Sequence, residues 1–509
     1  MRITKSKTLR SVVAATGALA VLSLLAGCRV GPRYHTPTAP AATAPNYKES
    51  TVNFQDADGW KVANPQDAMI RGKWWEVFHE PELNALEEQL NVDNQNIKVS
   101  FENFMEARAL IAEARSQFWP TITAGGSWGR SRSSGNLRNS AQANTGQAST
   151  LWTAPLSVSW TPDLWGKIRN EVRSAEYASQ VSAADLELEK LTEQASLAQY
   201  YFEIRGQDML QQILSETVKA DQQALDAAQG AYDAGTGDYI SVVEARATLK
   251  SAQSSAINVG LSRAQYEHAI AMLVGKVATD FSIPVKPMIY TPPAIPTGVP
   301  SQLAERRPDI AAAERNLAAA NATIGIGYGA FFPQVSLSAG GGFESSTLKH
   351  IFDASSRFWS IGPSASQVIF DGGLYRAQLH QYEATYNANV ATYRQTVLTA
   401  FQQVEDAMAA TRIYSQQILT QQEAVKSAQE FLDLEMERYK SGVDPFVNVL
   451  TAQTTLFGDQ VTLNSLQVQQ MIAAVQLVQA LGGGWDRSQL PTAAQVGTKV
   501  PNSDYKMQQ

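Results

Sequence analysis

An internal repeat is the feature that most constrains the fold of this chain. The Tyr-Asp-Ala-Gly run at 232–235 matches Tyr-Lys-Ser-Gly at 439–442, 207 residues later, and the match continues without a gap to Gly482. Earlier in each half, Phe-Trp-Pro at 118–120 and Phe-Phe-Pro at 331–333 both precede an alternating run. A repeat of this kind means that one structural unit is encoded twice, so the 509 residues need not form unrelated domains in series.

Each half is expected to contain the same elements in the same order: a helix, two strands, a very long helix and a second long helix. We place the first helices at about 82–117 and 303–330, the strands at about 120–130, 151–162, 333–344 and 358–369, the very long helices at about 165–233 and 373–440, and the second long helices at about 238–275 and 445–481. Glycine-containing breaks separate the two long helices of each half.

Heptad spacing marks the long helices. Ala184, Leu188 and Leu191 begin a series with alternating steps of four and three, and a similar series runs from Val447 to Val478. A sustained period of 3.5 residues predicts left-handed coiled-coil packing. A helix of about 65 residues is roughly 100 Å long. The remaining faces are rich in Gln, Ala, Ser and Thr, which explains why only 17% of the residues are charged, against an average of about 25%.

Composition excludes several classes of function. The net charge of −7 provides no basic surface for nucleic acid. A single cysteine permits neither an internal disulfide nor a cysteine-based zinc cluster, and five scattered histidines show no metal-ligand spacing. No Ser-His-Asp arrangement, phosphate loop or carboxylate pair stands out. We therefore expect no catalytic residues and no enzyme activity, no metal or cofactor, and no nucleic-acid partner.

The four expected strands alternate large apolar with small polar residues, as at 156–160 and 335–338, and aromatic residues lie near their ends. This pattern is typical of a transmembrane β-barrel, although a small soluble sandwich packed on helices is the alternative. Open edges are not tolerated in lipid, and barrels begin at about 8 strands. Four strands per chain therefore require an oligomer, and the count permits either a dimer or a trimer.

The N-terminus resembles that of a bacterial lipoprotein. A basic segment and a short apolar stretch end in Leu-Leu-Ala-Gly before Cys28, the pattern of a signal peptide at 1–27 with a lipidation site. We expect Cys28 to be acylated, palmitate being one such acyl chain; the alternative is a secreted protein with a free buried thiol. Arg29, rather than an aspartate, follows the cysteine, which by resemblance to sorted lipoproteins favours the outer membrane.

The expected domain organisation combines these signals. It comprises a signal peptide at 1–27, a lipidated tether at 28–65, a first repeat at 66–280, a proline-rich crossover at 281–300, a second repeat at 301–485 and a C-terminal tail at 486–509.

Several motifs together resemble one family. They are Cys-Arg-Val-Gly-Pro-Arg-Tyr at 28–34, Trp-Trp at 74–75, Asp-Leu-Trp-Gly at 163–166, Leu-Ala-Glu-Arg-Arg-Pro-Asp-Ile at 303–310, Phe-Asp-Gly-Gly at 370–373 and Leu-Gly-Gly-Gly-Trp at 481–485. The chain is similar to TolC-like outer-membrane efflux lipoproteins of the OprM/NodT type. The resemblance implies a mainly α fold with a small β part, and a homotrimer whose 12-stranded barrel in the outer membrane joins an α-helical barrel in the periplasm.

The same resemblance implies a function and partners. Members form the exit duct of tripartite pumps that export drugs or other small toxic compounds. Their partners are a periplasmic adaptor, an inner-membrane transporter (here expected to be of the RND type) and outer-membrane lipid. Two alternatives stay open from the sequence: the channel of a type I protein secretion system, and a coiled-coil lipoprotein without a pore.

The breaks between the long helices are candidate docking sites. Gly235, Thr236 and Gly237 form one break, and the other consists of Gly442, Val443 and Asp444. Glycine permits the left-handed conformation that a turn between helices needs, and a simple turn is the plain interpretation. The family resemblance adds that adaptors dock at these tips.

The first turns beyond the tips are candidate gate positions. By heptad phase, Ile240 and Glu244 match Val447 and Thr451. The resemblance implies an apolar ring and an acidic ring that close the periplasmic entrance. Thr451 stands where a carboxylate is common in the family, so Glu244 is the remaining acidic candidate. Ordinary coiled-coil packing is the alternative for each position.

Overall fold

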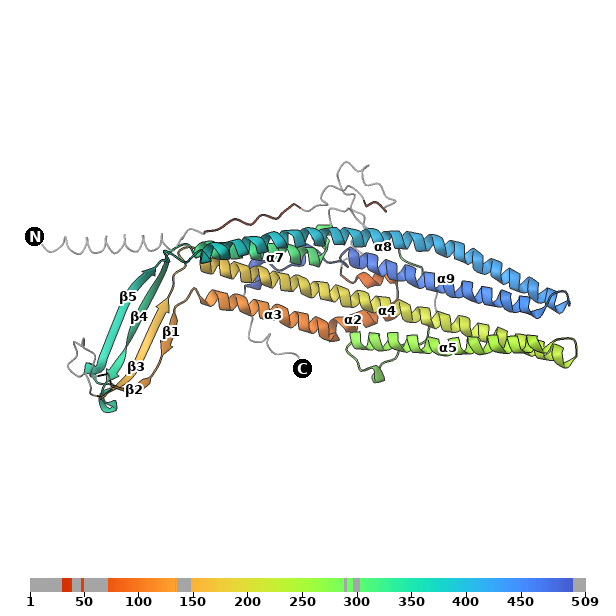
Figure 1. Cartoon of the computed structure of the whole chain (residues 1–509), viewed down its shortest axis with the longest axis horizontal. Coiled ribbons are helices and arrows are strands. Elements are labelled where there is room, and N and C mark those ends of the chain that lie inside the picture. Colours follow the sequence, from red (N-terminus) through yellow and green to blue (C-terminus); the bar gives the residue numbers. More distant parts are fainter. Residues whose placement is uncertain are drawn as a thin grey trace, which may run out of the picture.

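Two helices of 67 residues, α4 (Lys167–Asp233) and α8 (Leu374–Lys440), set the length of the molecule (Figure 1). Each is followed by a 35-residue helix that runs back along it, α5 (Tyr239–Leu273) and α9 (Phe446–Ala480). We call α4–α5 the first hairpin and α8–α9 the second hairpin. Equal lengths and the constant spacing of 207 residues show that the two hairpins are the same element repeated.

This is a computed structural model, and it describes residues 30–38, 47–49, 72–132, 134, 148–287, 291–295 and 303–497. The expected signal peptide and Cys28 lie outside the described residues. The expected tether, crossover and C-terminal tail are described only in part.

The hydrophobic core follows the heptad positions of the long helices. One cluster joins α4 to α5 and α9 around Phe202, Ile270 and Val475. A second joins α8 to the end of α9 around Val397 and Leu477. A third lies close to the tips and contains Ala224, Ala228, Val242, Ala245, Phe446, Val449 and Leu450. Side chains at the seam are buried, as coiled-coil packing requires.

The helical segment before the first strands is interrupted. The 3-10 helix η3 (Trp74–Phe78) precedes α2 (Pro81–Asp93) and α3 (Gln95–Ser116). The expectation of one helix over 82–117 is therefore wrong at Asn94, whose backbone is extended and whose side chain accepts a hydrogen bond from Ile97 N at 3.0 Å. An N-cap of this kind satisfies the first free amides of a new helix. Trp74 and Trp75 are buried in the first core cluster.

The matching segment of the second repeat is interrupted too, between α6 (Leu303–Arg306) and α7 (Pro308–Gly329). Pro308 begins α7, where no amide hydrogen is needed, and Asp309 lies in its positive first turn. Arg307 donates from Nη1 to the Ala480 carbonyl at 2.9 Å and from Nη2 to Asp309 Oδ2 at 2.6 Å. Arg307 thus fixes the start of α7 to the end of α9.

Glycines in the Gly-Ile-Gly-Tyr-Gly run at 325–329 let α7 pack closely against its neighbours. A Cβ atom on Gly325 would lie 2.4 Å from Asn170 Nδ2, and a Cβ atom on Gly31 would lie 2.7 Å from Gly325 Cα. Helix α4 and the N-terminal segment can both approach α7 only because these side chains are absent.

The five strands form one antiparallel sheet at the end opposite the hairpin tips (Figure 1). They are β1 (Thr121–Ala124), β2 (Ser127–Arg132), β3 (Ala148–Trp160), β4 (Gln334–Ser345) and β5 (Arg357–Ser366). The order is β1-β3-β4-β5, and β2 also pairs with β3. The first of the four expected strands is thus broken at Gly125 and Gly126, while Gly125 N still donates to the Pro155 carbonyl at 3.0 Å.

Short elements complete the described chain: the 3-10 helices η4 (Ala278–Asp280), η6 (Leu348–His350), η7 (Ala354–Ser356) and η8 (Arg487–Gln489), and the helix α10 (Ala493–Val496). The prediction of a mainly helical chain with a small sheet is confirmed. Within the described ranges, no helix combines the length and the apolar character needed to span a membrane.

Candidate functional site

The sheet has two chemically different faces. The register pairs Ile122 with Val158, Val158 with Ala339, and Ala339 with Ile361. Side chains alternate between faces along a strand, so large apolar residues gather on this face. Its members include Ile122, Trp128, Trp152, Leu156, Val158, Trp160, Leu337, Ala339, Phe343, Trp359 and Ile361. Several of them, including Trp128, Trp359 and Ile361, are exposed in the single chain.

The opposite face carries small polar residues. Thr123 pairs with Ser157, Ser157 with Gly340, and Gly340 with Ser360. Ser336 and Ser364 form a hydrogen bond of 2.7 Å across β4 and β5 on this face. Within the described chain, the outer edges of β1, β2 and β5 have no neighbouring strand. An amphipathic sheet with open edges needs further strands before it can be buried in lipid.

Both hairpin tips have the same turn. Gly235 and Gly442 have φ angles of 73° and 74°, in the left-handed region. After them, Thr236 N donates to the Ala231 carbonyl at 2.9 Å, and Val443 N donates to the Arg438 carbonyl at 3.0 Å. This pattern satisfies the last carbonyls of a helix. The six tip residues named from the sequence are exposed, apart from the partly buried Asp444.

Each tip holds an aspartate at a different turn position: at the spacing of 207 residues, Asp444 corresponds to Gly237, and Asp238 corresponds to Pro445. Asp238 caps α5 by accepting from Ser241 N at 2.7 Å, and this backbone hydrogen bond lowers the pKa of Asp238. Asp444 instead forms an ion pair with Arg438, whose Nη2 lies 3.1 Å from Asp444 Oδ1. The hydrogen bond from Arg438 lowers the pKa of Asp444. The aspartate therefore caps the returning helix in the first hairpin, whereas in the second hairpin it pairs with an arginine of α8.

The gate candidates lie one turn apart on each returning helix. Ile240 and Val447 are 67% and 46% exposed in the single chain. Thr451 donates from Oγ1 to the Val447 carbonyl of its own helix at 2.9 Å. The structure places each pair at the start of its hairpin's second helix, and no hydrogen bond or ion pair between described residues joins the α5 pair to the α9 pair. These residues stay candidates for a ring formed by several chains.

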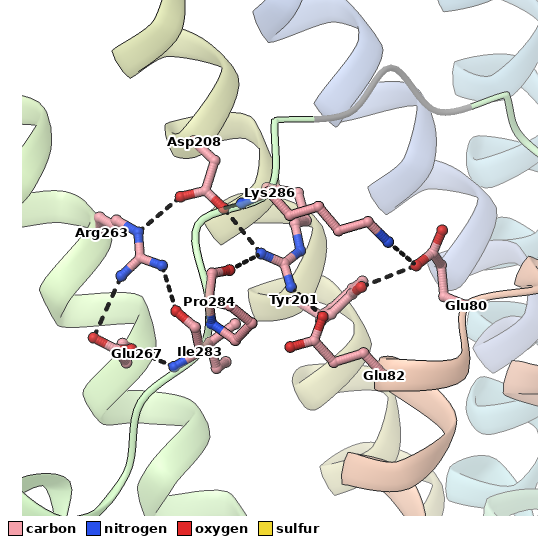
Figure 2. A network of polar contacts seen from close by, with 10 residues as sticks. Glu80, Glu82, Tyr201, Asp208, Arg263, Glu267, Ile283, Pro284 and Lys286 are labelled. Atoms are coloured by element: carbon pink, nitrogen blue, oxygen red, sulfur yellow. Dashed lines mark hydrogen bonds and ion pairs between the residues drawn. The ribbon is translucent and has the colours of Figure 1, made fainter.

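A buried charge network in the middle of the first hairpin was not predicted from the sequence (Figure 2). Arg205 of α4 is fully buried, and its Nη1 donates to Asp208 Oδ2 at 2.9 Å and to the Pro284 carbonyl at 2.7 Å. Its Nη2 donates to Glu82 Oε2 at 2.5 Å. The guanidinium also lies 4.9 Å from the centre of the Tyr201 ring.

The same network fixes the start of the crossover between the repeats (Figure 2). Arg263 of α5 donates from Nε to Asp208 Oδ1 and from Nη2 to the Ile283 carbonyl, both at 2.7 Å. In return, Ile283 N donates to Glu267 Oε1 at 2.6 Å and Lys286 N donates to Asp208 Oδ2 at 2.9 Å. The crossover is thus held to α4 and α5 through its own backbone.

A comparison of the two repeats in the sequence could have indicated this network. At the spacing of 207 residues, Ser415, Gln470 and Ala474 stand where the first repeat has Asp208, Arg263 and Glu267. Charged residues that appear in only one of two otherwise matching helices indicate a contact that the other helix lacks.

The carboxylate of Glu314 on α7 binds residues near both ends of the described chain. Tyr34 donates from its hydroxyl to Glu314 Oε1 at 2.9 Å, and Arg487 donates from Nη2 to Glu314 Oε2 at 2.8 Å. Burial is the main cause that raises the pKa of Tyr34, so its hydroxyl stays protonated and can donate. Val30 N also donates to the Trp165 carbonyl at 3.3 Å, beside the junction of β3 and α4.

Metal ligands are not grouped in the described part of the chain: no three His, Cys, Asp or Glu residues there could hold an ion together. Cys28, the expected lipidation site, lies outside the described residues.

Comparisons with known proteins agree with this arrangement. A family described as outer membrane efflux protein matches residues 86–276 and 299–483. The toluene efflux pump outer membrane protein TtgC of Pseudomonas putida is 30% identical over 464 residues, which are 91% of this chain and 94% of the relative. The solvent efflux pump outer membrane protein SrpC of Pseudomonas putida is 31% identical over 472 residues, 92% of this chain and 98% of the relative.

Solved structures share the fold. The outer-membrane channel OprN superposes with a TM-score of 0.78 at 28% identity, over 90% of this chain and all of that one.

Proposed function

Because the chain belongs to the outer membrane efflux protein family, we propose that three copies of it close into one channel that leads from the periplasm to the exterior. The chain is the outer-membrane component of an efflux pump. The observation that supports the closed channel is the amphipathic sheet, both edges of which have no neighbouring strand among the described residues. Its apolar face suits lipid, and its face of Ser, Thr and Gly suits a water-filled lumen.

The proposed number of copies is three rather than two. Each chain contributes four strand positions, because β1 and β2 follow one another along β3. Three chains give 12 strands, within the range of known barrels, and the family resemblance favours this number over 8. Three chains around a threefold axis would also arrange their six hairpins into a tube, with coiled-coil seams between neighbouring hairpins.

Lipid anchoring at Cys28 is the second part of the proposal. Val30, two residues after the proposed acylation site in the sequence, donates from its backbone N to the Trp165 carbonyl beside the sheet, which supports an anchor near the barrel. Acylation contributes about 0.8 kcal/mol per buried CH₂, so several chains give a stable anchor.

The hairpin tips are the proposed contacts for the rest of the pump. They are exposed, and they lie at the end of the molecule opposite the sheet (Figure 1). An adaptor would dock on residues 235–237 and 442–444, and an inner-membrane transporter of the RND type would deliver the substrate. The relatives' names specify toluene and solvent, so we propose small apolar toxic compounds, including drugs, as the exported class.

Complementation tests the proposal. In cells that lack this chain but keep their adaptor and transporter, an apolar fluorescent dye should accumulate, and wild-type chain should restore its export. A Cys28→Ser variant should be reduced in its amount in the outer membrane. Export of a protein substrate without any effect on the dye would contradict the proposed substrate class.

A further inference from the structure

Short non-helical segments from elsewhere in the chain bind the two long helices α4 and α8 at equivalent levels. Arg205 of α4 and Arg412 of α8 are equivalent positions in the repeat. Arg205 holds the crossover through the Pro284 carbonyl, and Arg412 holds the N-terminal segment through Glu49. We call residues 283–286 the first strap and residues 47–49 the second strap.

The second strap contacts α8 by backbone and side chain. Glu405 accepts Lys48 N at 2.7 Å and Glu49 N at 3.0 Å. Arg412 donates to Glu49 Oε2 from Nη2 at 2.6 Å and from Nε at 3.1 Å. The strap therefore depends on two charged residues of one helix.

Tyr47 anchors the second strap in the second core cluster. Its side chain is buried, and its ring lies 6.2 Å from that of Phe401 on α8. The same cluster contains Leu303 of α6, Ile310 of α7 and Leu477 of α9. Tyr47 thus packs where both helices of the second hairpin meet the short helices of the second repeat.

The two straps differ in how firmly they are held. Arg205 and Asp208 side chains are both 0% exposed, whereas Arg412 is 44% and Glu49 is 21% exposed in the single chain. Solvent and salt weaken exposed ion pairs, and buried ones are screened much less. The second repeat also lacks the charged partners of the first, since Ser415, Gln470 and Ala474 replace them.

We propose that residues 47–49 form a releasable strap that holds the second hairpin in its closed position, while the first strap is permanent. Release of Glu49 and the backbone of residues 48–49 from α8 frees the second hairpin to pivot at this level. The inference rests on the proposed channel function. It assigns Glu49, Glu405 and Arg412 as positioning residues that act through Tyr47 and α8, without contact with the exported compound.

Hydrogen exchange on the full-length protein tests docking of the strap independently of any channel activity. Arg412→Glu should speed exchange of the Lys48 and Glu49 amides at least tenfold, because it repels both Glu49 and Glu405. The charge swap Glu49→Arg with Arg412→Glu should restore protection. Arg394→Glu, an exposed charge reversal on the same helix, is the matched control and should have no effect.

Salt provides a second comparison within one molecule. Raising the salt concentration to about 1 M, where the Debye length is about 3 Å, should speed exchange at Lys48 and Glu49. The amides of Ile283 and Lys286 in the first strap should stay protected. Equal responses of the two straps, or protected amides in Arg412→Glu, would overturn the proposal.

Planar-bilayer recording tests the consequence for the channel. At low salt, Arg412→Glu should raise the conductance of the closed state at least twofold, and the charge swap should return it to the wild-type level. Faster exchange with an unchanged closed state would overturn the strap's role while the channel function stands. A wild-type protein that never conducts, although its amides respond as expected, would instead overturn the channel function.

Discussion

Arg205 shows what a single buried charge demands of its surroundings. Its guanidinium is fully enclosed, and Asp208, Glu82 and the Pro284 carbonyl accept its hydrogen bonds. A buried charge is tolerated when its partners remain in place, and loss of one partner leaves a charge without compensation. Burial also raises the pKa of Tyr201 to about 12, so its hydroxyl donates to Glu80 Oε2 at 3.1 Å at neutral pH.

Replacing Asp208 by Ala should therefore be strongly destabilising. Buried Arg205 and partly buried Arg263 lose their shared acceptor, and we expect a loss of about 3–5 kcal/mol in the free energy of unfolding. Ser415→Ala removes an exposed residue at the equivalent position of the second repeat and should change stability by less than about 0.5 kcal/mol. Thermal unfolding of the purified variants measures both. Equal melting temperatures would contradict a structural role for the network.

Asp221 gives the stability a pH dependence. It is 2% exposed on α4, its Oδ2 has no hydrogen-bond partner, and burial raises its pKa to about 6. The folded state thus binds the proton more tightly than the unfolded chain, whose Asp pKa is about 3.9. The penalty for the buried charge is full above pH 6 and disappears as the pH falls towards 4.

Asp221→Asn should accordingly stabilise the protein at pH 8, by up to about 3 kcal/mol for a shift of about two units. At pH 4 the variant and the wild type should have the same melting temperature. A difference that is independent of pH between 4 and 8 would show that the carboxyl group does not titrate in this range.

At the scale of elements, the sequence predicts the long helices well because heptad spacing and the repeat support the same assignment. The interruptions were not predicted. Asn94 and Arg307 end one helix and begin the next inside patterns that stay helical by periodicity, because capping and side-chain contacts decide there. The break at Gly125 and Gly126 was missed since β3 continues past it without interruption.

The gate candidates belong to the scale of elements, because each hairpin contributes one pair at the start of its second helix. If Val447 and Thr451 belong to the gate, replacing both by Ala should make the closed channel leakier, since their larger side chains are removed from the entrance. Planar-bilayer recording measures the leak. Thr455→Ala is the matched control, since its hydroxyl also bonds its own helix, to the Thr451 carbonyl at 2.9 Å. A leak that matches this control would remove the pair from the gate.

For the whole molecule, the sequence predicts that a single chain cannot close a barrel and must form an oligomer. The structure agrees, because both edges of the sheet lack a neighbouring strand among the described residues. Strand count alone permits two or three copies, because it does not fix the curvature of the sheet. The straps could not be predicted from local patterns. They join residues far apart in the chain, such as Glu49 with Arg412 and Pro284 with Arg205, and periodicity carries no information about such pairs.

Subunit counting in single channels tests most directly whether three copies enclose one pore. Ser338 lies on the small polar face, paired with Ser159 and Gly362, so Ser338→Cys should place one thiol per chain in the lumen. The sequence contains only one other cysteine, Cys28. A thiol-reactive cation added to an open channel in a planar bilayer should lower its conductance in three equal steps. Two steps, or a wild-type-like trace without any step, would contradict a trimeric channel lined by this face.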